Sequence, residues 1–283
     1  MNWHNYYQLA RFHKPIGTLL LWSPTAWALW VANKGNPPIS LTILLFLGTI
    51  FMRAAGCVLN DIADRNIDLH VKRTRDRPLT AGTVSLKEAV GLLLFFLIAA
   101  FLILIQLPFT CFYYALFALF ITFIYPFCKR FIQGPQLILG IAFSLGIPIA
   151  YVASNVFFDK SLFYLLLINY TWIVAYDTQY AMVDRQDDLK IGVKSTAILF
   201  ANSDRLIIGL LQLFLHLLWI LLVNYLSLSH VFYFVWALGA TILLYQQWLT
   251  SDRKEDNCLQ AFSWNGWYGL VMWVAIILGF NFK

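Results

Sequence analysis

The chain has 283 residues, of which 60% are hydrophobic and only 12% are charged, and its formal net charge is +6. A soluble domain is closer to half apolar and a quarter charged, so this chain cannot cover its surface with polar groups. The composition therefore excludes an ordinary soluble protein and predicts an integral membrane protein whose solvent includes the lipid bilayer.

Long apolar segments follow one another along the chain. A bilayer core about 30 Å thick is crossed by about 20 apolar residues in a helix. We therefore predict an all-α polytopic bundle of nine transmembrane helices, in a single domain over residues 1–283 and preceded by a short interfacial helix. The predicted spans are residues 16–32, 41–58, 89–105, 109–125, 137–156, 162–180, 206–226, 231–249 and 267–282.

The basic residues predict the orientation of these spans. With nine spans, sixteen of the twenty Lys and Arg residues lie at the N-terminus or in loops on the same side. Only Lys34, Lys160 and Lys283 lie on the other side, and Arg53 falls inside the second span. Because basic loops stay in the cytoplasm, we expect the N-terminus and the long loops there. The positive charge needs no nucleic-acid partner, since basic and aromatic residues do not alternate on a polar surface.

The second span runs into an acidic segment. Asn60, Asp64 and Asp68 are spaced i, i+4 and i+8, so on a continuous helix they share one face. Asp61 lies about 100° around the same helix. This spacing predicts a row of side-chain oxygens at the cytoplasmic end of the span.

A second acidic row follows the sixth span. Asp184 and Asp188 are spaced i, i+4, and Asp177 lies seven residues before Asp184, close to two helical turns. These three side chains are expected on one face. Asp187 is offset and is expected to face water or a basic neighbour.

Carboxylates stacked in this way repel one another, and a membrane boundary raises the cost further. Mg²⁺ is suited to bridging them, because it takes one or two carboxylates together with phosphate oxygens. Basic residues, which bind phosphate well, follow both rows: Lys72, Arg73, Arg75 and Arg77 after the first, and Lys190 and Lys194 after the second. A single DxxxD is more simply a solvated charged loop, but two equivalent rows followed by bases favour a Mg²⁺-diphosphate site.

The motif NDxxDxxxD at Asn60–Asp68, with DxxxD at Asp184–Asp188, resembles the UbiA superfamily of membrane prenyltransferases. Longer blocks are similar to the 4-hydroxybenzoate polyprenyltransferases of bacterial ubiquinone synthesis: KPIGTLLLWSPTAWALW from Lys14, MRAAGCVLNDIADRNID from Met52, YPFCKR from Tyr125, PQLILGIAFSLGIP from Pro135 and YDTQYAMVDRQDDLKIGVKSTAILF from Tyr176. The resemblance implies nine helices around a central cavity, two cytoplasmic cap loops and a lateral opening for a lipid tail.

The resemblance also implies an activity in the bacterial inner membrane. A polyprenyl group would pass from an allylic polyprenyl diphosphate to the ring carbon ortho to the hydroxyl of 4-hydroxybenzoate. Mg²⁺ and diphosphate would be held by five residues, Asn60, Asp64, Asp68, Asp184 and Asp188. The diphosphate would leave first, and the aromatic ring would then attack the allylic cation.

Four further residues have two readings each. The carboxylate of 4-hydroxybenzoate needs a cation, and the resemblance points to Arg130, although Arg130 could equally anchor its span at lipid headgroups. For Lys129 we favour the headgroup anchor. Arg53 is a functional candidate because it is an intramembrane arginine, or it forms a buried ion pair with Asp177. Asp177 could assist ring deprotonation or orient a basic partner.

Two other functions compete with this hypothesis. A sister enzyme of the menaquinone or haem pathway would use another acceptor, and the blocks at Met52–Asp68 and Tyr176–Thr196 argue against it, as does Arg130. A cation transporter would place acids near the membrane midplane, whereas here they gather at one face. The four cysteines show no metal-ligand spacing, so no zinc site is expected. The sequence leaves prenyl chain length and protein partners open.

Overall fold

The computed structural model describes residues 3–282, and every regular element among them is a helix. The prediction of an all-α fold is therefore confirmed. The elements are α1 (Trp3–Leu9), α2 (Ile16–Ala32), α3 (Ile39–Asp68), α4 (Leu86–Leu104), α5 (Thr110–Phe131), α6 (Pro135–Ser144), α7 (Gly146–Ala153), α8 (Lys160–Ile191), α9 (Thr196–Phe200), η1 (Ala201–Ser203), α10 (Asp204–Leu226), α11 (Val231–Leu249), η2 (Thr250–Asp252) and α12 (Glu255–Asn281).

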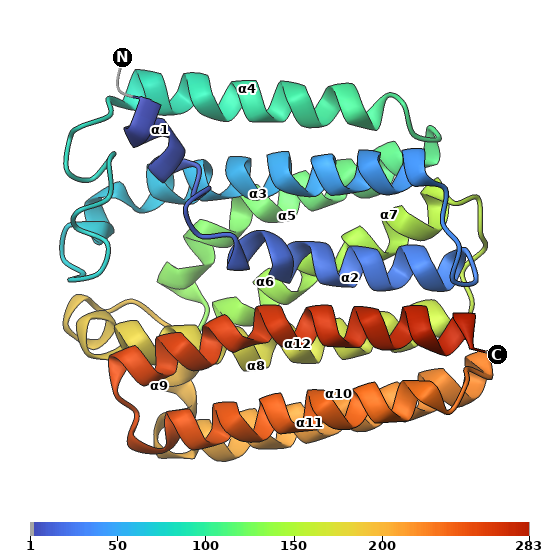
Figure 1. Ribbon diagram of the computed structural model, residues 1–283. Coiled ribbons are helices and arrows are strands. Elements are labelled where there is room, and N and C mark those ends of the chain that lie inside the picture. Colours follow the sequence, from blue (N-terminus) through green and yellow to red (C-terminus); the bar gives the residue numbers. More distant parts are fainter. Residues whose placement is uncertain (1–2, 283) are drawn as a thin grey trace.

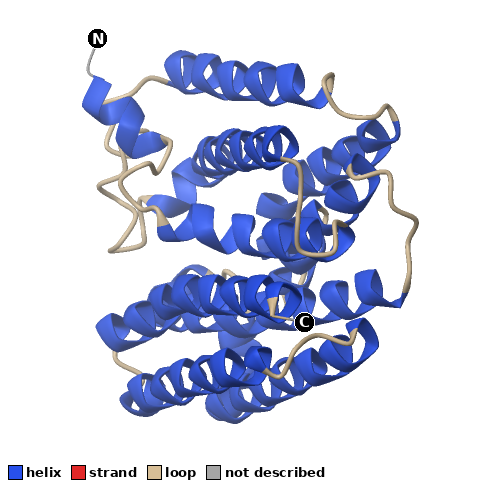
Figure 2. Ribbon diagram, turned by 45° about the vertical axis from the view of Figure 1, so that its right-hand side comes forward, coloured by secondary structure: helices blue, strands red, loops and turns tan. Residues whose placement is uncertain are grey.

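The long helices lie side by side and alternate in direction along the chain (Figure 1). Loops gather at the two ends of the bundle, as expected where backbone polar groups avoid lipid (Figure 2). Six helical segments of the described chain are long and apolar enough to cross a membrane, and α2 is a shorter apolar helix. The count of nine spans therefore stays a prediction.

Helices α3 and α8 both extend well beyond the ends of the apolar segments that predict them. The second span was expected to end at residue 58, but α3 continues to Asp68. The sixth was expected to end at residue 180, but α8 continues to Ile191 and ends at Gly192, whose φ of 73° is left-handed. Both acidic rows therefore lie on the polar extensions of long helices.

The predicted span 137–156 is interrupted. Helix α6 ends at Ser144 and α7 begins at Gly146, with Leu145 between them. The break lies just before Pro148, which cannot donate a backbone hydrogen bond and whose ring crowds the carbonyl four residues earlier. Pro135–Ala153 is nevertheless one of the six segments long and apolar enough to cross a membrane, and the Gly146–Pro148 sequence explains the break within it.

Helices α4 and α5 form the outer part of the bundle. Only 22% of the apolar window of α4 and 17% of that of α5 are buried. Their exposed side chains are large and apolar, among them Phe95, Ile98, Phe101, Phe117 and Phe120. Such a surface suits lipid and not water.

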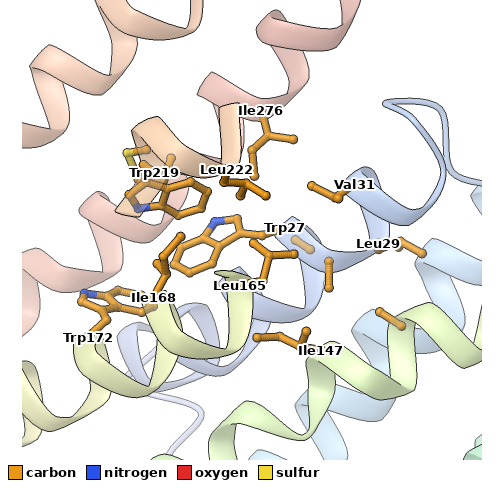
Figure 3. Packing of buried hydrophobic residues seen from close by; sticks show 14 of the residues in the cluster. Trp27, Leu29, Val31, Ile147, Leu165, Ile168, Trp172, Trp219, Leu222 and Ile276 are labelled. Atoms are coloured by element: carbon orange, nitrogen blue, oxygen red, sulfur yellow. The ribbon is translucent and has the colours of Figure 1, made fainter. Parts of the chain in front are cut away.

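Three tryptophans form the centre of the buried core. The ring of Trp27 on α2 lies 5.1 Å from that of Trp172 on α8 and 5.0 Å from that of Trp219 on α10 (Figure 3). Its Nε1 donates to the backbone oxygen of Gly269 on α12, at 3.0 Å. This cluster joins four helices and fixes α8, and with it the second acidic row.

A buried chain of amides joins the same half of the bundle. Trp172 Nε1 donates to Asn265 Oδ1 at 2.9 Å, and Asn265 Nδ2 donates to Gln179 Oε1 at 2.9 Å. Gln246 Oε1 accepts from Gln179 at 3.2 Å and from Gln212 at 2.7 Å. Because buried amides are costly unless paired, this network favours one arrangement of α8, α10, α11 and α12.

Candidate active site

A cavity of about 1180 Å³ reaches from the ends of α3 and α8 into the bundle. Its inner part is lined by apolar side chains of α3, α4 and α5, including Leu45, Leu97, Phe101, Leu104 and Leu116. Its mouth is lined by carboxylates, arginines and lysines. One cavity thus combines an apolar compartment with a strongly charged opening.

The first acidic row faces this cavity. Helix α3 is continuous through Asp68, and Asn60, Asp64 and Asp68 all line the cavity, as their spacing predicts. Asp64 is 3% exposed and Asp68 is 5% exposed. Carboxylates this deeply buried require cationic partners.

The second row lines the same cavity from α8, through Asp177, Asp184 and Asp188. Asp187 lies outside the lining and accepts hydrogen bonds from the backbone N of Lys72 at 3.0 Å and from Lys190 Nζ at 3.1 Å. The expectation that Asp187 faces a basic neighbour is confirmed. The two rows therefore face one shared space.

Two arginines from the segment that follows α3 pair with the rows, one with each row. Arg73 Nε donates to Asp184 Oδ1 at 2.9 Å, and Arg77 Nη1 donates to Asp68 Oδ2 at 2.7 Å. Burial acts to lower the pKa of Arg73, but Tyr180 and Asp184 outweigh it and raise the pKa above its usual value. Both guanidinium groups are thus charged at the cavity mouth.

Lys14 adds to the positive charge there. It lines the cavity, and its pKa is lowered by burial and by the nearby charges of Arg73, Arg11 and Arg77. A lysine that lies near three guanidinium groups forms with them a site for a multiply charged anion.

The remaining predicted bases divide into two groups. Lys194 lines the cavity, and its Nζ donates to the backbone oxygen of Phe131 at 3.1 Å. Lys72 and Lys190 lie on the exposed surface outside the lining, and Lys190 pairs with Asp187 at 3.1 Å. Not every base that follows an acidic row reaches the cavity.

Lys129 lies inside the site. Its Nζ donates to Asp64 Oδ2 at 2.8 Å, and the residue lines the cavity. The expectation of a headgroup anchor is therefore wrong for Lys129. Its spacing of i+4 from Tyr125, which also lines the cavity, is the sequence signal that could have revealed this. The neighbouring Arg130 donates to the backbone oxygen of Ala63 at 3.2 Å and lies outside the lining.

Arg53 and Asp177 both line the cavity. Within residues 3–282 no ion pair joins them, and the Arg53 guanidinium contacts the sulfur of Cys57 instead. A Cβ on Gly17 would lie 2.3 Å from Arg53 Nη2, so glycine at this position makes room for the arginine. The buried-pair reading of Arg53 is not supported, and its place in the cavity remains.

The site fits a hard divalent cation that shares its ligands with a phosphate group. Asp64 Oδ1 is buried and has no hydrogen-bond donor among the described residues. No three acidic, His or Cys side chains in that part of the chain lie close enough together to hold a metal unaided. A row that supplies one or two carboxylate oxygens, with phosphate oxygens completing the shell, is the arrangement that Mg²⁺ prefers.

Comparison with known proteins agrees with this geometry. Residues 21–276 match the UbiA prenyltransferase family. A 4-hydroxybenzoate octaprenyltransferase of Legionella pneumophila (strain Paris) is 57% identical over 97% of both chains. One from Haemophilus ducreyi (strain 35000HP / ATCC 700724) is 51% identical over 96% of this chain and 98% of the relative.

Solved structures share the fold at lower identity. A UbiA homologue from Aeropyrum pernix K1 superposes with a TM-score of 0.80 at 23% identity, over 92% of this chain and 97% of that one. A UbiA homologue from Archaeoglobus fulgidus, bound to GPP and Mg²⁺, gives a TM-score of 0.73 at 18% identity, over 96% of this chain and 99% of that one. The two structures therefore share the helical fold of this chain over nearly its whole length.

Proposed function

This chain belongs to the UbiA prenyltransferase family, and on that premise we propose that it is an integral membrane enzyme of bacterial ubiquinone biosynthesis. It transfers a polyprenyl group from an allylic polyprenyl diphosphate to the ring carbon ortho to the hydroxyl of 4-hydroxybenzoate. The observation that carries this proposal is the meeting of two carboxylate rows at the mouth of one largely apolar cavity. Such a cavity suits a substrate with a diphosphate head and an isoprenoid tail.

The head group of the donor is assigned to the charged mouth. Asn60, Asp64 and Asp68 from α3, with Asp184 and Asp188 from α8, would hold Mg²⁺ together with diphosphate oxygens. When bound, Mg²⁺ supplies positive charge that stabilises the leaving diphosphate. The unpartnered Oδ1 of Asp64 supports this assignment.

The bases that pair with these carboxylates have a second role. Lys129, Arg73 and Arg77 each lie within hydrogen-bond distance of an acid of the two rows. When the diphosphate binds, their donors turn to its oxygens and stabilise the charge that grows as the allylic C–O bond breaks. The diphosphate leaves with the bonding electron pair.

The aromatic ring then forms a C–C bond to the allylic cation, and the ring carbon loses its proton. Asp177 lines the cavity and is the carboxylate we assign to accept that proton. The apolar compartment and the loop after α3 exclude water, which would otherwise trap the cation as an alcohol.

Two arginines compete for the carboxylate of 4-hydroxybenzoate. Arg130 is the candidate from sequence resemblance, whereas Arg53 lines the cavity. We assign Arg53, because a cation inside the cavity can pair with the acceptor without crossing the wall of the site. Arg53→Gln is expected to raise the KM for 4-hydroxybenzoate more than Arg130→Gln does.

The orientation follows from charge. The loops at the end that holds the site carry most of the Lys and Arg residues, so we infer that this end faces the cytoplasm.

The function is tested with membranes that contain the protein, labelled 4-hydroxybenzoate and a polyprenyl diphosphate. Label should move into a lipid-extractable product when Mg²⁺ is present and stop moving when it is chelated. Membranes without the protein are the control, and acceptors of the menaquinone and haem pathways test the competing assignment. Absence of lipid-soluble label with every divalent metal tried would overturn the proposal.

A further inference from the structure

Asp61 is the acid of the first motif whose oxygens are most fully used within the chain. It is 1% exposed, and both of its carboxylate oxygens accept from Arg11 Nη2, at 2.7 and 2.9 Å. Its Oδ1 also accepts from Arg77 Nη1 at 3.0 Å. Asp64, by contrast, keeps one oxygen without a donor among the described residues. Asp61 therefore has less capacity left for a metal or a substrate.

The two arginines reach Asp61 from segments far apart in the sequence. Arg11 follows α1, and Arg77 belongs to the loop of residues 69–85 that follows α3. Arg77 Nη1 also donates to Asp68 Oδ2 at 2.7 Å. Arg77 therefore joins Asp61 to the acidic row of the cavity. Arg11, Asp61 and Arg77 all line the cavity, so this link lies at its wall.

The N-terminal segment is packed where it can hold this loop. Leu9 and Ala10 are buried in one cluster with Leu79 and Val84 from the loop. Tyr6 OH donates to Glu88 Oε1 at 2.6 Å, at the start of α4. These contacts join the N-terminal segment, residues 3–15, to the second half of the loop and to the start of α4.

The backbone conformation of Arg11 indicates that surrounding contacts hold this residue in place. Its φ is 58°, a left-handed conformation that a residue with a Cβ adopts only at a cost. Such a conformation persists where surrounding contacts impose it. Here it turns the chain after α1 and directs the guanidinium to Asp61.

We propose that Asp61 is a positioning residue, which links the N-terminal segment to the loop 69–85 through Arg11 and Arg77 and thereby holds Arg77 toward the diphosphate end of the cavity. The inference rests on the proposed function for the identity of the ligand, but the link itself does not. Asp61 then acts through Arg77 and does not itself bind Mg²⁺ or diphosphate.

The test compares Arg11→Gln, Asp61→Asn and the double variant with wild-type full-length protein. Arg65→Gln is the matched control, because Arg65 is exposed and lies one turn from Asp61 on α3. Each single variant should raise the KM for polyprenyl diphosphate about tenfold, the scale of one charge-assisted hydrogen bond. The KM for 4-hydroxybenzoate and the Mg²⁺ dependence should stay near wild type, whereas kcat should fall, because Arg77 also stabilises the leaving diphosphate. The double variant should be no worse than Asp61→Asn, because both changes break one link.

A second measurement needs no turnover. Lys72 and Arg75 are exposed trypsin sites in the loop, so limited trypsin digestion of the detergent-solubilised protein reports how firmly the loop is held. Arg11→Gln should be cut there faster than wild type or Arg65→Gln. Arg11→Gln leaves Asp61 paired with Arg77. Its digestion therefore tests the link even if Asp61→Asn does not accumulate in the membrane.

Three results would overturn the inference. One is wild-type kinetics and digestion in Arg11→Gln. Another is a changed Mg²⁺ dependence in Asp61→Asn alone, which would make Asp61 a metal ligand. The third is additive loss in the double variant, which would mean that Arg11 binds the diphosphate independently. If wild-type protein transfers no prenyl group but its loop is protected as described, the proposed function fails and the link stands.

Discussion

At the scale of single residues, neighbouring positions on one helix differ most sharply in what they contact. Lys129 and Arg130 are adjacent at the end of α5, but Lys129 pairs with Asp64 at 2.8 Å and Arg130 lies outside the cavity. Adjacent residues on a helix point about 100° apart, so one enters the site and the other faces away.

This pair provides a direct prediction. Lys129→Gln should lower kcat/KM for the polyprenyl diphosphate about 100-fold, since it removes the cation beside Asp64 that we assign to the leaving diphosphate. Arg130→Gln should leave that constant near wild type. Steady-state kinetics of both variants in membranes check the expectation, with protein amounts matched by immunoblot. A larger loss in Arg130→Gln than in Lys129→Gln would contradict it.

Two acids on α8 provide a second pair. Asp184→Asn should lower turnover about 100-fold or more, because it removes a carboxylate that we propose to hold Mg²⁺ and diphosphate. Asp187→Asn should keep most of the turnover, since Asp187 lies outside the cavity and accepts hydrogen bonds from Lys72 and Lys190. Product formation at saturating Mg²⁺ distinguishes them, and equal activity of the two variants would refute the assignment of Asp184.

The spacing of the acids was enough to predict that both rows lie on helical faces, because i, i+4 positions coincide whatever the rest of the fold does. The direction in which Lys129 points has a weaker signal. Its i+4 spacing from Tyr125 places both on one face of α5, but the sequence does not say that this face lines the cavity. The pairing of Arg11 with Asp61 depends on tertiary contact across fifty positions of sequence, which local periodicity does not contain.

At the scale of elements, apolar windows predicted the position of each long helix but not its full length. Helices α3, α8 and α12 run on through polar residues that a hydropathy window excludes, and α12 begins at Glu255 where residue 267 was expected. The break between α6 and α7 has a local signal in the sequence, the Gly146–Pro148 segment. A prediction based on the length of the apolar segment does not use that signal. Helix ends are set by caps and by packing, which composition does not report.

Close packing between elements gives a further prediction. A Cβ on Gly269 of α12 would lie 2.4 Å from Ser23 Oγ and 2.8 Å from Trp172 Cη2, so Gly269→Ala should separate α12 from α2 and α8. We expect a loss of about 1–3 kcal/mol in the free energy of unfolding. Thermal melting of the protein in detergent measures it.

The matched control for that experiment is Gly91→Ala on α4. A Cβ on Gly91 meets no atom within 4 Å, so this variant should melt at or above the wild-type temperature. Equal destabilisation of the two variants would show that helix–helix contact at Gly269 is not the cause.

At the scale of the whole molecule, the loops at one end of the bundle carry the site and those at the other end carry little charge. The four cysteines are buried, so the native chain should not react with a membrane-impermeant maleimide. In inside-out vesicles Asn202→Cys, at the end that holds the site, should be labelled and Asn36→Cys should not. Intact spheroplasts should give the reverse. Labelling of both positions from one side would contradict the alternating topology.

The glutamine pairing inside the bundle has a consequence for biogenesis. Gln247 on α11 donates to Gln212 on α10 at 2.8 Å, and Gln246 accepts from the same residue. If α11 left the translocon alone, these amides would enter lipid without partners. Only residues 227–230 separate the two helices, so we expect α10 and α11 to partition into the bilayer together, as a hairpin in which Gln212 is already bonded to Gln246 and Gln247.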